Sequence, residues 1–137
     1  MTSTLVDSNV LLDILGEKTT LHDWSADRLA ELRAKGRLCI NPVIYAELTP
    51  SLSLETAHRV LASMQITREA LSFEAAWRAG TAHAAYRRAG GLRERTLPDF
   101  LIGAHAAIAD YTLLTRDAAR YRTYFPELNI VSPDTNS

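Results

Sequence analysis

Four carboxylates stand beside apolar segments, where an acidic side chain needs compensation: Asp7, Glu47, Asp99 and Asp117. Two carboxylates about 4 Å apart repel by roughly 4 kcal/mol at an effective dielectric constant of about 20. If the four converge, a divalent cation or shared protons must offset this repulsion. Oxygen ligands with no cysteine or histidine motif beside them predict Mg²⁺ or Mn²⁺. All four are therefore candidate metal ligands and candidate catalytic residues.

The elements that must position these acids can be read from the alternation of short apolar runs and helical patterns. We expect strands at 4–6, 38–40, 111–114 and 128–131, and helices at 9–15, 23–35, 42–49, 53–64, 72–89, 96–109 and 117–124. This alternation predicts an α/β fold with a central, mainly parallel sheet of four to five strands. The length of 137 residues predicts a single domain, with a frayed tail at 133–137.

Two of the four acids follow expected strands, and the other two lie on expected helices. Asp7 ends the first strand, and Asp117 follows the strand that ends at Leu114. In a parallel sheet the carboxyl ends of the strands lie at one edge, where open α/β folds place their sites. Glu47 and Asp99 instead project from apolar faces of helices, where an uncompensated charge is costly. The pattern predicts an acidic site at the carboxyl edge of the sheet.

Each acid also has a purely structural interpretation. Asp99 stands three residues after Thr96, as in a capping box, and Asp117 stands at a helix start. Any of the four could be a helix cap or the partner of an arginine. The spacing alone does not decide between this interpretation and a metal site.

Composition limits the function classes. A formal net charge of −1 excludes nucleic-acid binding driven by bulk positive charge, but not a local basic patch. The only cysteine, Cys39, lies in an apolar run, where we expect it to pack as a small hydrophobe in a reducing, cytoplasmic environment. No apolar stretch approaches the ~20 residues of a membrane span, so we expect no membrane association.

Four segments in order resemble the motifs of PIN-domain ribonucleases, and their spacing is most similar to that of the VapC-type toxins of bacterial toxin–antitoxin pairs. They are Asp-Ser-Asn-Val-Leu-Leu-Asp at 7–13, Asn-Pro-Val-Ile-Tyr-Ala-Glu-Leu at 41–48, Leu-Pro-Asp-Phe-Leu-Ile-Gly-Ala at 97–104 and Leu-Thr-Arg-Asp at 114–117. The resemblance extends from residue 4 to residue 133. Many relatives carry phenylalanine at the position of Tyr121, and some carry a second acid after the fourth motif that is absent here.

The resemblance implies a three-layer α/β/α sandwich and a Mg²⁺- or Mn²⁺-dependent endoribonuclease that acts as a toxin. It places Asp7, Glu47, Asp99 and Asp117 at the acidic positions and the supporting polar residues Ser8, Asn9 and Thr115 beside them. We expect Asp7 and Asp99 to be the main direct ligands. The implied partners are an RNA substrate, a cognate antitoxin of the VapB type, and a second copy of the chain in a homodimer or a toxin–antitoxin hetero-oligomer.

Arginines are the candidate RNA-binding residues, because an acidic site repels RNA and a planar guanidinium grips phosphate. The candidates flank the Gly90-Gly91 pair or adjoin the fourth acid: Arg87, Arg88, Arg93, Arg95 and Arg116. The alternative is a solvated helix end and loop. A stripe of Trp77, Thr81, Ala84 and Arg88 on the preceding helix is either core or a dimer contact.

Two rival functions remain open. A catalytically silent PIN-like module would bind RNA or a partner without cutting. An aspartate-based phosphotransfer domain would also carry an acid after its first strand, but it needs a second acid nearby, where Asn9 stands, and a lysine after a late strand. The two lysines, Lys18 and Lys35, both precede the second expected strand.

Overall fold

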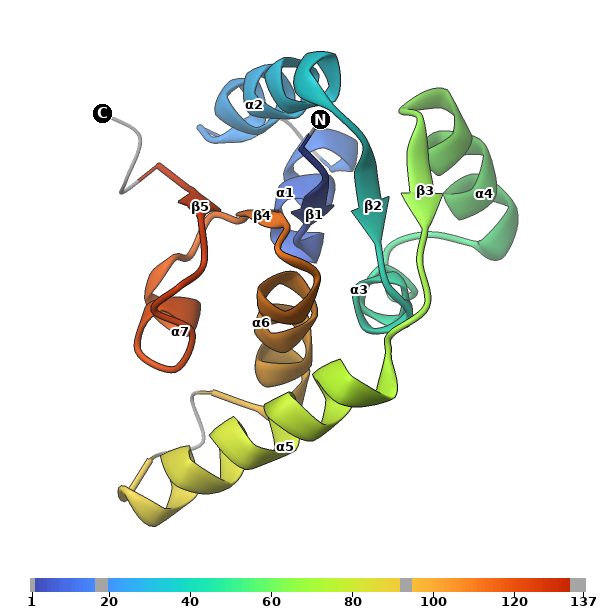
Figure 1. Cartoon of the computed structure of the whole chain (residues 1–137). Helices are drawn as coiled ribbons and strands as arrows, with labels where there is room; N and C mark the ends of the chain where they lie inside the picture. The colour runs from blue at the N-terminus through green and yellow to red at the C-terminus, as the bar shows by residue number, and fades with distance from the viewer. Residues whose placement is uncertain (1, 17–19, 92–94, 134–137) are drawn as a thin grey trace.

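A five-stranded, all-parallel sheet forms the centre of the computed structural model, which describes residues 2–16, 20–91 and 95–133. The strand order is β3-β2-β1-β4-β5, so β1 lies between β2 and β4 (Figure 1). The strands are β1 Thr4–Val6, β2 Leu38–Ile40, β3 Ile66–Arg68, β4 Thr112–Leu114 and β5 Ile130–Val131. The prediction of an α/β fold with a parallel sheet is confirmed.

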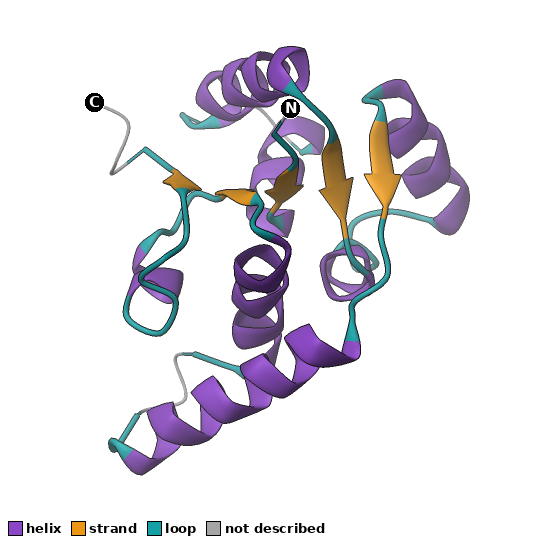
Figure 2. Ribbon diagram, viewed as in Figure 1, coloured by secondary structure: helices purple, strands orange, loops and turns teal. Residues whose placement is uncertain are grey.

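Helices cover both faces of this sheet. In the view of Figure 1, α1 and α4 lie behind the strands and α6 lies in front, which makes three layers. Figure 2 shows the long helix α5 crossing beyond the carboxyl ends of the strands, where it packs on α6. Within the described residues the helices are α1 Ser8–Leu15, α2 His22–Lys35, α3 Pro42–Glu47, α4 Leu54–Ser63, α5 Phe73–Arg88, α6 Leu97–Ala109 and α7 Ala119–Arg122.

The three inner strands form because their side chains are apolar enough to be buried on both faces. Every residue of β1, β2 and β4 is buried, which is typical of strands covered by helices on both sides. Cys39 in β2 is wholly buried, and burial raises the pKa of its thiol to about 12, so it packs as the small hydrophobe that the sequence predicts. No helix in the described part of the chain is long and apolar enough to cross a bilayer.

Side-chain caps set the starts of several helices. Asn41 Oδ1 accepts a hydrogen bond from Ile44 N at 2.9 Å, and Pro42 occupies the first turn of α3. Ser53 and Ser72 accept in the same way from the backbones of α4 and α5. These caps fix where α3 begins, and therefore where Glu47 at its end lies.

The outer elements depart from the expectations. No strand was expected at 66–68, yet β3 pairs in parallel with β2. Only Ile66 of that strand is buried, so the apolar signal is one residue long. The helix expected over 117–124 is the four-residue α7, and the last strand contains two residues.

The small-residue face of α5 packs against α6 and forms a second core cluster. Ala75, Ala79 and Ala82 let the helix approach Phe100 closely. Trp77 is 80% exposed and Phe73 is 95% exposed, so both lie on the opposite, outer face. The core interpretation of the Trp77 stripe is therefore wrong.

Gly103 and Gly80 make a matched pair for testing this packing. A Cβ at Gly103 would lie 2.6 Å from the Phe125 ring, whereas a Cβ at Gly80 would meet nothing within 4 Å. We expect Gly103→Ala to lower the free energy of unfolding by about 1–3 kcal/mol through overpacking. Gly80→Ala should raise it by about 0.5–1 kcal/mol, because alanine favours helix. Urea unfolding checks both, and equal effects would contradict the packing described.

Candidate acidic site

Asp7 is the most constrained of the four acids. It caps α1, is only 2% exposed, and accepts a hydrogen bond on Oδ1 from Ser8 N at 2.8 Å. Its Oδ2 accepts from the Thr115 hydroxyl at 2.8 Å and from the Tyr121 hydroxyl at 2.7 Å. Burial raises the pKa of Asp7, although the hydrogen bonds from Tyr121 and Thr115 act in the opposite direction. The carboxylate is therefore firmly held in a setting that disfavours its charge.

Glu47 is joined to Asp7 through the residue between them in space. The Ser8 hydroxyl donates to Glu47 Oε1 at 2.8 Å. Burial raises the pKa of Glu47, and the negative charges of Asp7 and Asp99 raise it further. Three of the predicted acids thus lie within electrostatic reach of one another.

Asp99 and Asp117 meet through an arginine. Arg120 Nε pairs with Asp117 Oδ2 at 2.9 Å, and its Nη1 lies 3.6 Å from Asp99 Oδ1. Asp99 Oδ2 also accepts from Thr96 N at 3.2 Å, as in a capping box. The structural interpretation is therefore confirmed for both acids, because Asp99 caps α6 and both acids pair with an arginine. The same arginine holds the two acids at one edge of the sheet.

The small polar residues tie the two central turns together. Asn9 Nδ2 donates to Thr115 Oγ1 at 3.3 Å, and Asn9 Oδ1 accepts from Arg116 N at 3.1 Å. Thr115 Oγ1 also accepts from Asp117 N at 3.1 Å. The turn after β1 and the turn after β4 therefore form one hydrogen-bonded unit beneath the acids.

A buried polar chain supports α3 and α6 behind the site. Asn41 Nδ2 lies 3.0 Å from His105 Nδ1, and His105 Nε2 lies 2.8 Å from Glu69 Oε2. Because Asn41 caps α3 and His105 belongs to α6, this chain fixes the helix of Glu47 against the helix of Asp99.

The predicted RNA-binding arginines are divided between two places. Arg87 and Arg95 line a hollow of about 480 Å³ between the end of α5 and the start of α6, and Arg88 is exposed nearby. Arg93 lies outside the described residues. Arg116 Nε pairs with the buried Asp13 at 3.2 Å, which gives its side chain a structural partner.

The oxygen donors at this edge suit a hard divalent cation, but the described side chains do not surround a position for one. Among the residues that the structure describes, no three His, Cys, Asp or Glu side chains converge closely enough to hold a metal ion. The donors at this edge are carboxylate oxygens, which fit Mg²⁺ or Mn²⁺ chemically. A bound cation would take over the neutralising role of Arg120, which is the guanidinium now paired with two of these acids.

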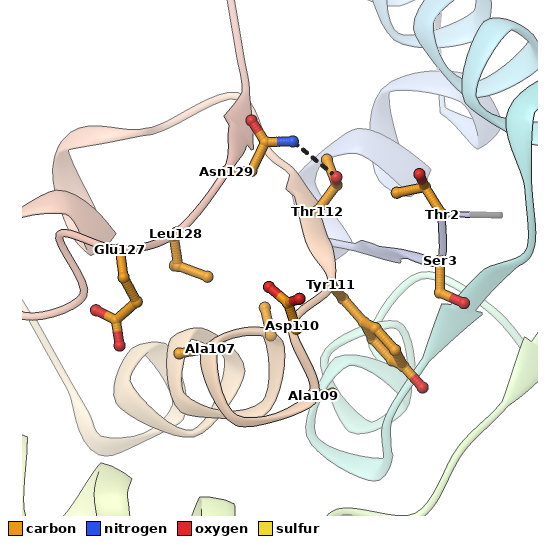
Figure 3. Close-up of a pocket in the computed structure, with 11 residues that line it drawn as sticks. Thr2, Ser3, Ala107, Ala109, Asp110, Tyr111, Thr112, Glu127, Leu128 and Asn129 are labelled. Atoms are coloured by element: carbon orange, nitrogen blue, oxygen red, sulfur yellow. Dashed lines mark hydrogen bonds between the residues drawn. The ribbon is translucent and has the colours of Figure 1, made fainter.

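A second hollow, of about 460 Å³, lies at the other end of the sheet. Figure 3 shows it beside the start of β4, with Asp110, Glu127 and Asn129 around it and Asn129 Nδ2 donating to Thr112 Oγ1 at 2.9 Å. It is separate from the acidic site, because the acids follow the strands and this hollow precedes them.

Two residues of the acidic site were not predicted to act there. Arg120 could have been found, since it stands three residues after Asp117, the spacing of a helical ion pair. The hydroxyl of Tyr121 contacts an aspartate 114 positions away, so no local pattern indicates the contact.

A family model described as PIN domain matches residues 4–126. A search of curated proteins found no match.

Several solved structures share the fold. A chain of VapBC2 from Rickettsia felis, solved with a DNA fragment from their promoter, aligns with a TM-score of 0.74 and 18% identity over 96% of this chain and 98% of that one. VapBC-1 from nontypeable Haemophilus influenzae aligns with a TM-score of 0.72 and 16% identity, over 96% of this chain and 98% of that one. DNA-bound VapBC from Salmonella typhimurium aligns with a TM-score of 0.71 and 20% identity, over 96% of this chain and 98% of that one. At these identities the likeness establishes the fold.

The burial of the Glu47 charge and its repulsion by Asp7 and Asp99 predict that Glu47→Gln stabilises the metal-free protein near neutral pH. Glutamine keeps an oxygen for the Ser8 hydroxyl and removes one negative charge. Folding raises the pKa of Glu47 above its ordinary 4.5. The wild type therefore loses stability as the pH rises from about 4.5 through the raised pKa of the folded protein. The variant should gain about 0.5 kcal/mol near pH 7, a modest value because solvent reaches the partly exposed Glu47, and nothing below about pH 4.

Urea unfolding in EDTA at the two pH values measures this gain. Glu55→Gln is the control, because Glu55 lies in the first turn of α4 and its charge favours that helix. A wild type as stable as Glu47→Gln near neutral pH would contradict the repulsion.

Proposed function

The chain belongs to the PIN domain family, and on that basis we propose that it is a Mg²⁺- or Mn²⁺-dependent endoribonuclease that acts as the toxin of a toxin–antitoxin pair. The observation that carries the proposal is the gathering of four carboxylates from separate segments at one edge of the sheet, with Arg120 between two of them. Such a cluster is unfavourable in the resting protein, so it is more readily explained by a cation-dependent reaction than by stability.

In this proposal Asp7 and Asp99 hold the metal directly, and Glu47 and Asp117 hold it directly or through water. The bound metal would lower the pKa of a water molecule and draw charge from a phosphate oxygen. Ser8, Asn9 and Thr115 keep the carboxylates in place through the hydrogen bonds described above. The work of the protein is thus to orient acidic oxygens on a rigid base.

Positive groups at the rim hold the RNA. Arg87, at the end of α5, and Arg95, just before α6, line the same hollow, where they can pair with RNA phosphates. Arg120 is a further phosphate ligand in this scheme, because neutralisation of Asp99 and Asp117 by a metal would weaken its present ion pairs.

The proposed partners are an antitoxin and a second copy of the chain. The neighbours in fold include VapBC proteins and FitAcB from Neisseria gonorrhoeae, and one is described as a toxin–antitoxin complex from Klebsiella pneumoniae. The outer face of α5 exposes Phe73 and Trp77, which favours the dimer-contact interpretation of that helix.

A catalytically silent PIN-like module is the second candidate. The observation in its favour is that the acids do not enclose a metal position among the described residues. An aspartate-based phosphotransfer domain has less support, because Lys35 ends α2 beside the start of β2, away from Asp7.

Cleavage of total cellular RNA separates these candidates. We expect discrete cuts in Mn²⁺ or Mg²⁺, none in EDTA, and a loss of more than about a hundredfold in Asp7→Asn and Asp99→Asn, which remove a ligand charge. Asp110→Asn, at the far end of the sheet, is the control and should cut normally. Full metal-dependent cleavage by Asp99→Asn would contradict the ligand assignment. No cleavage by folded, metal-loaded wild type would leave the silent module as the better account.

The rim arginines predict a change in salt dependence. We expect the double variant Arg87→Gln/Arg95→Gln to bind single-stranded RNA more weakly, with a slope of log K against log[salt] reduced by about 0.7 per lost phosphate contact. Fluorescence anisotropy at several salt concentrations measures the slope. Arg59→Gln, exposed on α4, serves as the control, and an unchanged slope in the double variant would exclude these two arginines from the RNA path.

A further inference from the structure

Tyr121 places a buried hydroxyl directly on one oxygen of Asp7. The side chain is wholly buried, and its hydroxyl donates to Asp7 Oδ2 at 2.7 Å. A phenylalanine would fill the same volume without this bond. Packing of the ring therefore does not require the hydroxyl, and the contact that the hydroxyl adds is the hydrogen bond to Asp7.

The hydrogen bonds of Asp7 leave its two oxygens unequal. Each carboxylate oxygen has two lone pairs. Oδ2 accepts from both the Thr115 and the Tyr121 hydroxyls, so both of its lone pairs are used. Oδ1 accepts from Ser8 N and keeps one lone pair. Asp7 consequently has a single oxygen position to offer a cation.

The ring of Tyr121 is also held against the helix that carries Asp99. A Cβ on Gly103 of α6 would lie 3.1 Å from Tyr121 Cδ1, so the ring packs closely on the backbone at this glycine. Gly103 is four residues after Asp99 and shares its face of α6. The hydroxyl thus joins Asp7 to a fixed point on the helix of Asp99.

We propose that Tyr121 is a positioning residue which, with Thr115, limits Asp7 to one metal-facing oxygen and so selects small octahedral cations over Ca²⁺. Ca²⁺ takes six to eight oxygens and commonly uses both oxygens of a carboxylate, whereas Mg²⁺ requires close octahedral geometry at about 2.0–2.1 Å. A carboxylate restricted to one oxygen suits the second geometry. This inference rests on the proposed metal-dependent function.

The test compares two tyrosine-to-phenylalanine variants of the full chain. Tyr121→Phe removes the bond to Asp7. Tyr111→Phe is the matched control, because its hydroxyl also donates to a carboxylate, Glu69 Oε1 at 2.8 Å, outside the acidic site. Electron paramagnetic resonance of free Mn²⁺ gives the Mn²⁺ affinity, and competition gives that of Ca²⁺. We expect the ratio of Mn²⁺ to Ca²⁺ affinity to fall about tenfold in Tyr121→Phe, the usual scale for a residue that orients a ligand, and to stay unchanged in Tyr111→Phe.

The possible outcomes distinguish failure of the inference on Tyr121 from failure of the proposed metal-dependent function. If the wild type binds no Mn²⁺, the proposed function fails. If the wild type binds Mn²⁺ but the ratio is the same in Tyr121→Phe, or falls equally in both variants, the inference on Tyr121 is overturned and the function stands. If circular dichroism shows that Tyr121→Phe is unfolded, Thr115→Val, which removes the other bond to Asp7 Oδ2, must lower the ratio instead. An unchanged ratio there would also overturn the inference.

Discussion

Burial of carboxylates, with repulsion between them as a smaller addition, is the constraint around which the carboxyl edge of this sheet is built. Asp7 and Glu47 both have pKa values raised by burial, and the charges of Asp7 and Asp99 add to the effect at Glu47. The hydrogen-bond donors at this edge offset part of this cost, and Arg120 supplies positive charge to Asp99 and Asp117. Removal of a hydrogen-bond donor from Asp7 should therefore also affect Glu47, because their charges interact.

Parallel topology explains why residues so distant in sequence share this edge. β1 and β4 are neighbours, so the turns that follow them lie side by side and exchange hydrogen bonds through Asn9 and Thr115. α3 and α6 then bring Glu47 and Asp99 to the same edge, and the contacts of His105 with Asn41 and Glu69 hold the two helices together. The buried contacts that hold α3 against α6 therefore also set the positions of the Glu47 and Asp99 carboxylates.

The sequence indicated the parts of this arrangement that depend on local patterns. Buried runs of three residues and capping residues such as Asn41 predicted the inner strands and most helices, and hence the edge where the acids gather. β3 was missed because an edge strand with a single buried residue, Ile66, has no apolar run. The contact of Tyr121 with Asp7 could not be predicted, since it depends on how α7 packs on α6 and not on spacing along the chain.

The most direct test of a metal site at this edge is an anomalous difference map from crystals soaked in Mn²⁺. We expect a peak within coordination distance of Asp7 Oδ1 and of an oxygen of Asp99, with Arg120 turned away from Asp99 and Asp117. A map without a peak there, in which Arg120 still bridges Asp99 and Asp117, would contradict it.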